Sequence, residues 1–220
     1  MDGETRRFIL DNTDLTAPPH VPEIRLHLAT EAHELWLKTE EELEGLGLPP
    51  PYWAFAWAGG QGLARHLLDH PEWVRGKSVL DFATGSGLVA IAAKLARAGS
   101  VTACDIDGFA AMAAAMNAAR NDVRFALRCD DVLGRDDGWQ VVLAGDVFYD
   151  QDLAKAVLPW FDTLSGRGAT ILVGDPGRAY CPVDRLSVLA VYRVPVTKAL
   201  EDSDVKKTTV WRYHASGGST

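Results

Sequence analysis

The middle of the chain combines glycines and carboxylates at the spacing of a nucleotide site. Residues 79–90 read VLDFATGSGLVA, so an apolar strand ends beside Asp81, a turn of small residues follows, and a helix begins. Gly85 and Gly87 let the backbone approach a ligand closely, and the new helix offers unpaired N–H groups at its positive end. Asp105 lies at the end of the next expected strand, where a carboxylate accepts hydrogen bonds from a ribose diol.

This turn by itself fits two kinds of cofactor. The sequence from Gly85 to Ala90 satisfies the pattern G-x-G-x-x-A of dinucleotide-binding proteins. Asp81, directly before the turn, would repel a pyrophosphate but suits a ligand that carries an ammonium and a sulfonium group. The helical sequence before the first strand and the expected hairpin at the C-terminus also differ from a dinucleotide fold, which continues with βαβ units. An NAD-binding oxidoreductase, or a non-catalytic nucleotide sensor, remains the alternative from a different class.

A second group of candidate residues follows the fourth expected strand, where the sequence from Asp146 to Asp150 reads DVFYD. Ligands bind beyond the carboxyl ends of parallel strands, so this segment should border the reacting group. A lysine amine has a pKa of about 10.4 and must lose a proton before it attacks an electrophile. We expect Asp146 to bind and orient the ammonium, and Tyr149 and Phe148 to form an apolar wall that favours the neutral amine. In the alternative, Asp146 caps the helix that begins near Gln151, and the aromatic residues belong to the core.

Short β-rich runs alternate with helical stretches from Ser78 onward, which places both groups of residues at one edge of a sheet. The expected strands are Ser78–Phe82, Ser100–Asp105, Val123–Arg128, Gln140–Gly145 and Ala169–Gly174. The expected helices are Leu88–Ala98, Gly108–Arg120 and Leu153–Leu164. Two further strands, Arg185–Pro195 and Thr208–His214, have no crossover helix between them and should form an antiparallel hairpin. The chain is therefore predicted to be α/β, with a Rossmann-like seven-stranded sheet, mostly parallel with an antiparallel C-terminal hairpin, and helices on both faces.

The sequence before the first of these strands has a different pattern. Apolar residues at mostly helical spacing predict a helix over Pro22–Leu43. Three prolines at 49–51 end it, and the aromatic segment Tyr52–Trp57 follows. A short helix is then expected over Gln61–Leu68.

The composition is that of one soluble globular domain, with 220 residues, 47% hydrophobic and 24% charged. No repeat or linker marks a second domain, so we expect a single domain over 1–220, with an N-terminal helical segment (1–75) before the cofactor-binding core (76–220). The net charge of −8 argues against a general nucleic-acid binder and is compatible with a cationic partner. No apolar run is long enough to span a bilayer, and the N-terminus has no secretory signal.

The cysteines and histidines show no metal-binding spacing. Cys104, Cys129 and Cys181 lie far apart and form no C-x-x-C pair, and His66 and His70 have no third ligand nearby in the sequence. We therefore expect a cytoplasmic protein that binds no metal ion. We also expect a monomer that binds no membrane and no nucleic acid.

The glycine turn and its flanking acids resemble the first motif of the class I, seven-strand methyltransferases that use S-adenosylmethionine. That motif has an acid, a hydrophobic residue and three glycines at alternate positions, and Ala83 stands here in place of the first glycine. This resemblance implies that Asp81 and the backbone around Ala83, Gly85 and Gly87 bind the methionine end of the cofactor. It implies that Asp105 binds the ribose and that Ile106 or Asp107 lies beside the adenine. At the adenine amine it implies Asp130 or Asp131, with Asp130 preferred.

Three further segments narrow the resemblance. They are the DVFYD sequence at Asp146, WAFAWAGGQ over Trp53–Gln61, and GDPGR over Gly174–Arg178. Together they look like the electron-transfer-flavoprotein β-subunit lysine methyltransferases, over nearly the whole chain. The resemblance implies that Trp57 packs near S-adenosylmethionine, that Asp146 and Tyr149 face the target lysine, and that the flavoprotein β-subunit is the protein partner.

Several assignments stay open. Trp53 belongs either to the site or to the core, because aromatic residues dominate cores. Asp175 and Arg178 either contact the substrate or pair with each other across their turn. Methylation of a ribosomal protein such as L11 is a competing function, although that family carries an N-x-P-P-type segment that is missing here. Methylation of a small-molecule amine is a third.

Overall fold

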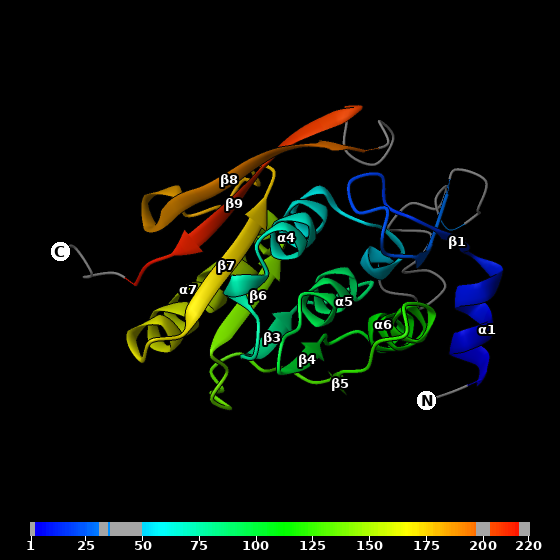
Figure 1. Ribbon diagram of the computed structural model, residues 1–220, viewed down its shortest axis with the longest axis horizontal. Helices are drawn as coiled ribbons and strands as arrows, with labels where there is room; N and C mark the ends of the chain where they lie inside the picture. Colours follow the sequence, from blue (N-terminus) through cyan, green and yellow to red (C-terminus); the bar gives the residue numbers. More distant parts are fainter. Residues whose placement is uncertain (1–2, 31–34, 36–49, 197–202, 216–220) are drawn as a thin grey trace.

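The computed structural model describes residues 3–30, 35, 50–196 and 203–215, and its centre is a seven-stranded sheet (Figure 1). The strands lie in the order β5-β4-β3-β6-β7-β9-β8. Their bounds are β3 Ser78–Phe82, β4 Ser100–Cys104, β5 Ala126–Arg128, β6 Val141–Gly145, β7 Thr170–Asp175, β8 Leu186–Pro195 and β9 Val205–Tyr213. Strands β3 to β7 are parallel, and β9 runs antiparallel to both β7 and β8. The predicted sheet with its antiparallel C-terminal hairpin is confirmed.

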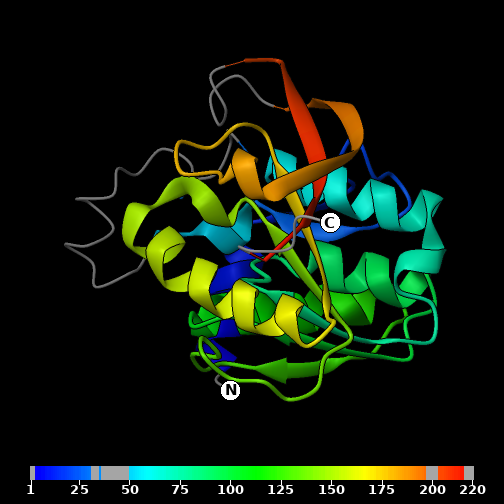
Figure 2. The same cartoon turned by 90° about the vertical axis from the view of Figure 1, so that its left-hand side faces the viewer.

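Helices cover both faces of the sheet, as the two views in Figures 1 and 2 show. They are α4 (Ala58–Asp69), α5 (Leu88–Leu95) and α6 (Gly108–Arg120) on one face, and α7 (Gln151–Gly166) on the other. Alternate strand residues decide which core each face joins, because successive side chains of a strand point to opposite sides. Val79 and Leu143 pack with α4 and α5, whereas Leu80 and Val142 pack with α7.

The observed bounds follow the predicted ones closely in this core. The predicted limits of β3 and α6 match in full. Helix α5 ends at Leu95, before the expected Ala98, and Arg97 already has a left-handed backbone with φ of 67°. Helix α7 begins at Gln151, because the carboxylate of Asp150 caps its first turn.

The prediction of a helix over Pro22–Leu43 is wrong for residues 22–30, although Leu35, the one other described residue in this range, is helical. Leu26–Leu28 forms strand β2, which pairs antiparallel with β1 (Asp14–Thr16). The rest of the predicted helix falls largely on 31–34 and 36–49, which lie outside the described residues.

Packing against α6 explains this difference. All three residues of β2 are buried, and the backbone N–H of His27 donates to Oδ1 of Asn117 on α6 at 2.8 Å. Helix α1 (Gly3–Asp11), which the sequence reasoning did not predict, packs on α6 as well and buries Ile9 in the same cluster as Met116. These long-range contacts override the local helical spacing, as tertiary context often does.

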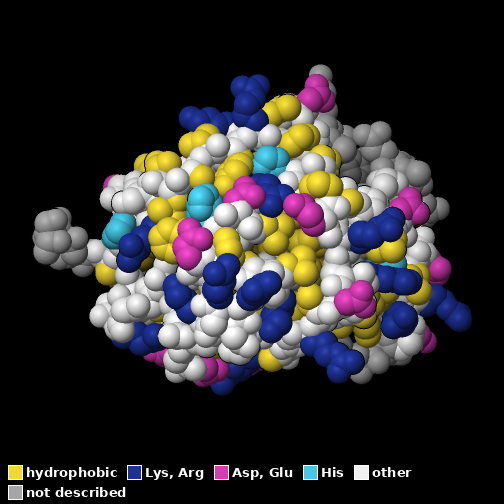
Figure 3. All heavy atoms as spheres, viewed as in Figure 1, with side chains coloured by type: hydrophobic (Ala, Val, Ile, Leu, Met, Phe, Trp, Pro, Cys, Tyr) yellow, Lys and Arg dark blue, Asp and Glu magenta, His cyan; other side chains and the backbone are white. Residues whose placement is uncertain are grey.

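The surface carries charges of both signs. On the face seen in Figure 3, lysine and arginine side chains are interspersed with acidic and apolar ones. Within the described part of the chain, no helix is both long and apolar enough to cross a membrane. The same residues include no group of three or more His, Cys, Asp or Glu placed to hold a metal ion.

Candidate active site

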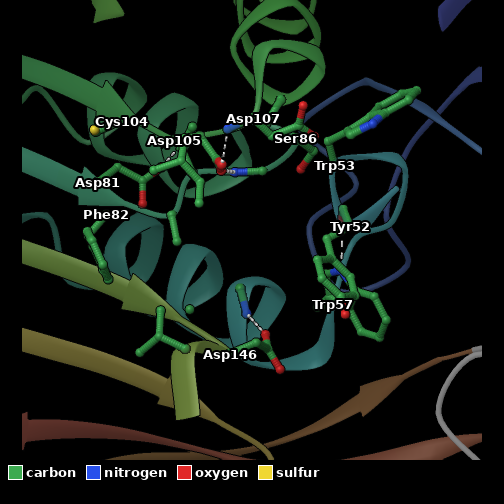
Figure 4. A pocket seen from close by; sticks show the side chains of 18 of the residues that line it. Tyr52, Trp53, Trp57, Asp81, Phe82, Ser86, Cys104, Asp105, Asp107 and Asp146 are labelled. Carbon is green, nitrogen blue, oxygen red and sulfur yellow. Dashed lines mark hydrogen bonds between the residues drawn. The ribbon is translucent and has the colours of Figure 1, made fainter. Parts of the chain in front are cut away.

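A cavity of about 720 Å³ opens at the carboxyl ends of β3, β4 and β6. Its walls come from the turns after these strands and after β5, and from the aromatic segment before α4. Figure 4 shows Asp81 and Asp105 on one side of the space, Tyr52 and Trp57 on the other, and Asp146 at its base. The two groups of residues singled out in the sequence therefore share one cavity.

The turn between β3 and α5 has a left-handed backbone at three positions. Ala83, Gly85 and Gly87 have φ of 53°, 52° and 81°. Glycine adopts this conformation without steric cost, whereas a Cβ costs roughly 1–2 kcal/mol. Gly87 also lacks room for a side chain, since a Cβ there would lie 3.0 Å from Ala114 of α6. Ala83 thus keeps the geometry of a glycine turn and adds strain to it.

Asp81 is a buried carboxylate at the start of this turn, only 1% exposed. Its Oδ2 accepts hydrogen bonds from the Thr84 hydroxyl and from the Ala90 N–H, the latter at 2.9 Å. Burial raises the pKa of Asp81 to about 7, although both hydrogen bonds favour the charged form. A cationic group placed beside Asp81 would restore the carboxylate.

Asp105 follows β4 and fixes the turn to that strand. Its Oδ2 accepts the N–H of Gly85 at 2.9 Å, and its Oδ1 accepts the N–H of Asp107 at 3.1 Å. Burial raises the pKa of Asp105. Because a carboxylate has about four lone-pair positions, these bonds leave acceptor capacity toward the cavity that Asp105 lines.

The residues predicted around an adenine also line the cavity. Ile106 is 78% exposed, and Asp107 caps α6. The carboxylate of Asp130 pairs with Arg128 at 2.6 Å, and this hydrogen-bonded pair lowers the pKa of Asp130. Oδ1 of Asp131 accepts a backbone N–H from the loop that follows it. Asp130 therefore has a structural role beside the cavity.

Asp146 lies at the end of β6, with a left-handed backbone (φ 57°) and 8% exposure. Its N–H donates to the carbonyl of Gly174 at 2.9 Å. Oδ2 accepts the N–H of Gly60 at the start of α4 at 2.8 Å (Figure 4), and Oδ1 accepts from Nη2 of Arg178 at 2.6 Å and from its Nε at 3.1 Å. The carboxylate is thus fixed from two sides at the base of the cavity.

Helix α4 reaches this carboxylate because glycines remove the side chains between the helix and the sheet. A Cβ on Gly174 would lie 2.1 Å from the carbonyl oxygen of Gly59. A Cβ on Gly145 would lie 2.9 Å from Cα of Gly60, and a Cβ on Gly59 would lie 2.5 Å from Oδ2 of Asp146. The two glycines of the WAGGQ sequence therefore bring a backbone N–H group onto the carboxylate of Asp146.

The structure corrects the prediction for Phe148. This side chain is fully buried in the core under α7 and does not line the cavity. Tyr149 does line it, is 48% exposed, and has its ring 5.5 Å from that of Tyr52. The aromatic wall of the cavity therefore includes Tyr149 and Tyr52 in place of Phe148. The alternative in which Asp146 caps the next helix is also wrong, because Asp150 makes that cap.

Arg178 and Asp175 have separate roles. The guanidinium carbon of Arg178 lies 5.5 Å from the ring centre of Trp57, whose Nε1 donates to the Tyr52 carbonyl at 2.9 Å. Asp175 is 2% exposed and accepts backbone N–H groups of its own turn, including that of Arg178 at 2.8 Å. Asp175 does not line the cavity, and the side chain of Arg178 pairs with Asp146 instead of with Asp175. The predicted pair across the turn therefore forms through the backbone N–H of Arg178 and not through its side chain.

Trp53 lies in the core and also lines the cavity. It is 2% exposed, stacks on Phe109 of α6 with ring centres 6.0 Å apart, and lines the cavity. The sequence reasoning missed Tyr52, Gly60 and Thr84. Tyr52 begins the aromatic segment and Thr84 stands inside the glycine motif, so their positions gave a signal. The N–H of Gly60 gave none, because every residue except proline has one.

Comparison with solved structures places this architecture among methyltransferases. The chain superposes on a ribosomal protein L11 methylase from Lactobacillus delbrueckii subsp. bulgaricus with a TM-score of 0.52 and 22% identity, over 73% of this chain and 81% of that one. It superposes on magnesium protoporphyrin IX methyltransferase from Synechocystis PCC 6803, solved with bound SAM, with a TM-score of 0.53 and 10% identity, over 71% and 78% of the two chains. The family model described as ribosomal protein L11 methyltransferase (PrmA) matches residues 66–145. The chain therefore has the class I methyltransferase fold.

Relatives at higher identity identify the family. The electron transfer flavoprotein beta subunit lysine methyltransferase of Danio rerio is 39% identical over 97% of this chain and 84% of its own length. The protein of the same name from Homo sapiens is 37% identical over 97% and 83%. A ribosomal protein L11 methyltransferase from Burkholderia thailandensis matches only 34% of the chain, at 42% identity. The chain belongs to the electron transfer flavoprotein beta subunit lysine methyltransferase family.

Proposed function

We propose that this chain transfers methyl groups from S-adenosylmethionine to lysine side chains of the electron transfer flavoprotein β-subunit. The observation that carries the proposal is the buried carboxylate of Asp146, in the same cavity as the glycine turn and the rings of Tyr149 and Trp57. A carboxylate and aromatic faces together bind a cationic amine. The relatives named for this activity match nearly the whole chain, which supports the β-subunit over L11 as the substrate.

The charge of the cavity supports S-adenosylmethionine over a dinucleotide. Among the described residues that line it, Arg178 is the one basic side chain. The acidic ones are Asp81, Asp105, Asp107, Asp130, Asp131 and Asp146. Such a lining would repel a pyrophosphate, whereas it attracts a sulfonium and an ammonium group. The residues present therefore fit the cofactor that the glycine turn left undecided.

The contacts of the cofactor follow from the positions of these side chains. Asp81 and the glycine turn would hold the methionine end, and Asp105 would accept hydrogen bonds from the ribose hydroxyls. Ile106 would cover one face of the adenine. We now prefer Asp131 to Asp130 at the adenine amine, because the carboxylate of Asp130 is held by an arginine.

When bound, S-adenosylmethionine supplies a methyl group on a positively charged sulfur, which is an activated electrophile. The chain has to present a neutral amine to it. Asp146 binds the lysine ammonium and aligns it, while Tyr149, Tyr52 and Trp57 exclude water and disfavour the charged amine. The amine would have to lose its proton to solvent before these rings shield it from water. Its neutral nitrogen would then be positioned to take up the methyl group that the cofactor would supply. Positioning therefore supplies most of the rate.

The test is transfer of radiolabel from S-adenosylmethionine to the recombinant β-subunit, with the modified lysines located by mass spectrometry. We expect the β-subunit to be labelled and L11 to stay unlabelled. Label on L11 or on small amines, with the β-subunit unlabelled, would contradict the proposal.

A thermal-shift measurement tests the cofactor separately. S-adenosylhomocysteine should raise the melting temperature and NAD should not, because a ligand that binds only the native state stabilises it. Stabilisation by NAD alone would favour the oxidoreductase or nucleotide-sensor alternative.

A further inference from the structure

A cation of the chain itself already lies on the carboxylate at the catalytic end of the cavity. The guanidinium of Arg178 donates to Oδ1 of Asp146 at 2.6 Å from Nη2, and it lies over the ring of Trp57. A carboxylate and an aromatic face are the groups that recognise a cationic amine. Arg178 therefore makes the contacts that a lysine ammonium would need.

Two backbone groups hold Asp146 in addition to Arg178. Its backbone N–H is bound to the carbonyl of Gly174, and its Oδ2 is bound to the N–H of Gly60. Both partners are backbone groups, held by the glycine contacts between α4 and the sheet. What Arg178 adds is charge, because a carboxylate that is 8% exposed is costly without a counterion.

The backbone of Arg178 is held independently of its guanidinium. Asp175 accepts the backbone N–H groups of Gly177 and Arg178, at 2.6 and 2.8 Å, and so anchors the turn. The charged group stands at the end of a flexible stem, and the side chain of Arg178 is 21% exposed. Displacement of the guanidinium would therefore take rotation of side-chain bonds and the loss of its contacts with Asp146 and Trp57.

We propose that Arg178 is an internal occupant of the lysine site. In the substrate-free protein its guanidinium takes the place of the target ammonium on Asp146, and substrate binding exchanges one cation for the other. This inference rests on the proposed function, since the incoming group is a lysine side chain. The exchange keeps the buried carboxylate paired at every stage, so the lysine enters without leaving an isolated charge.

The exchange also selects the kind of amine that is methylated. Arg178 is tethered beside Asp146, so it competes at a high effective concentration. A lysine on a protein is delivered with the docking energy of the whole partner surface, whereas a free amine brings only its own contacts. Arg178 thereby excludes small amines from a site whose chemistry would accept them.

The test replaces Arg178 by methionine, which keeps an unbranched stem and removes the charge. Arg65→Met is the matched control, because the side chain of Arg65 is 20% exposed, pairs with Glu23 and Asp69, and does not line the cavity. With the β-subunit at mildly alkaline pH, we expect KM of Arg178→Met to fall about fivefold, equivalent to about 1 kcal/mol, with kcat retained. Arg65→Met should leave both unchanged. Arg178→Gln serves as the second variant if the methionine variant is unstable.

Two results would overturn the inference. A fall in kcat with KM unchanged would make Arg178 a positioning residue for Asp146. Weaker binding of S-adenosylhomocysteine would make it a ligand of the cofactor.

A binding experiment separates this inference from the proposed function. With saturating S-adenosylhomocysteine, n-butylamine should raise the melting temperature of Arg178→Met and not that of the wild type. Equal shifts in both proteins, or a shift in neither, would overturn the exchange. A wild-type protein that leaves the β-subunit unlabelled would instead contradict the proposed substrate, whatever this measurement gives.

Discussion

Replacing Asp146 by asparagine changes one oxygen into an NH₂ group and leaves the shape of the side chain intact. The carboxylate now accepts from the N–H of Gly60 on one oxygen and from Arg178 on the other. An asparagine has a single acceptor oxygen, so its NH₂ group must face one of these two donors. No rotation of the amide satisfies both partners.

The cost follows from this mismatch. A buried donor left without an acceptor costs about 1–3 kcal/mol, and the charge pair with Arg178 contributes less than a fully buried pair because that side chain is 21% exposed. We expect Asp146→Asn to lower the free energy of unfolding by about 2 kcal/mol, or the melting temperature by roughly 4–8 °C. Methyl transfer should fall at least about 100-fold, equivalent to about 2.7 kcal/mol, because the amine loses its charged partner.

The assay combines urea unfolding, titration with S-adenosylhomocysteine, and transfer of radiolabel. Asp150→Asn is the control from the same DVFYD segment, because asparagine caps a helix as well as aspartate does. It should keep both stability and activity. The double variant Asp146→Asn with Arg178→Met should recover part of the lost stability, since one of the two competing donors is gone.

Two outcomes of this assay would refute the reasoning. If Asp146→Asn were as stable as the wild type, the mismatch argument would fail. If it lost affinity for S-adenosylhomocysteine, Asp146 would belong to the cofactor site.

Three further predictions concern the glycine turn and the packing of α4. Burial raises the pKa of Asp81 to about 7, so the folded state holds a proton that the unfolded state releases above about pH 4. The free energy of unfolding should therefore fall as pH rises from about 4 to 7. In urea titrations, Asp81→Asn should lose this dependence on pH. Ala83→Gly should raise the free energy of unfolding by about 0.5 kcal/mol, because the strain of a Cβ on a left-handed backbone slightly exceeds the entropy cost of glycine. A decrease of more than about 1 kcal/mol in the free energy of unfolding would contradict this. Gly174→Ala should cost more than about 2 kcal/mol and reduce transfer, since its Cβ would meet the carbonyl of Gly59. Gly166→Ala, which has open space, should fold normally, and equal stabilities would contradict the packing argument.

Much of the fold could be predicted because its signals are local. The alternation of apolar residues and the small-residue turn identify β3, α5 and β4, and the missing crossover identifies the hairpin β8–β9. Strand β2 could not be predicted, because its residues carry a helical spacing that is overridden by burial against α6. Its neighbour in space, Asn117, lies 90 residues further along the chain than His27.

Some residues of the candidate site could likewise be predicted from the sequence, and others could not. The carboxylates Asp81, Asp105 and Asp146 could be placed in one cavity, because the carboxyl ends of parallel strands meet at one edge of a sheet. The burial of Phe148 beside the exposed Tyr149 could not be predicted. A short 3₁₀ segment directs these neighbouring side chains to opposite environments, and their order depends on the left-handed backbone of Asp146.

The sequence by itself determined the sheet, the glycine turn and the carboxylates at the strand ends. These depend on residue type and on spacing within a few turns of chain. Only the tertiary structure decided what surrounds Asp146, because its partners Gly60 and Arg178 lie 86 and 32 residues away along the chain. Glycine-to-glycine packing of α4 on the strand ends brings Gly60 there, and the pairing of β6 with β7 brings the turn that carries Arg178. Hydrogen bonds act over about 3 Å in space, whatever the separation along the chain. The partners of Asp146 can therefore be identified only from the folded structure.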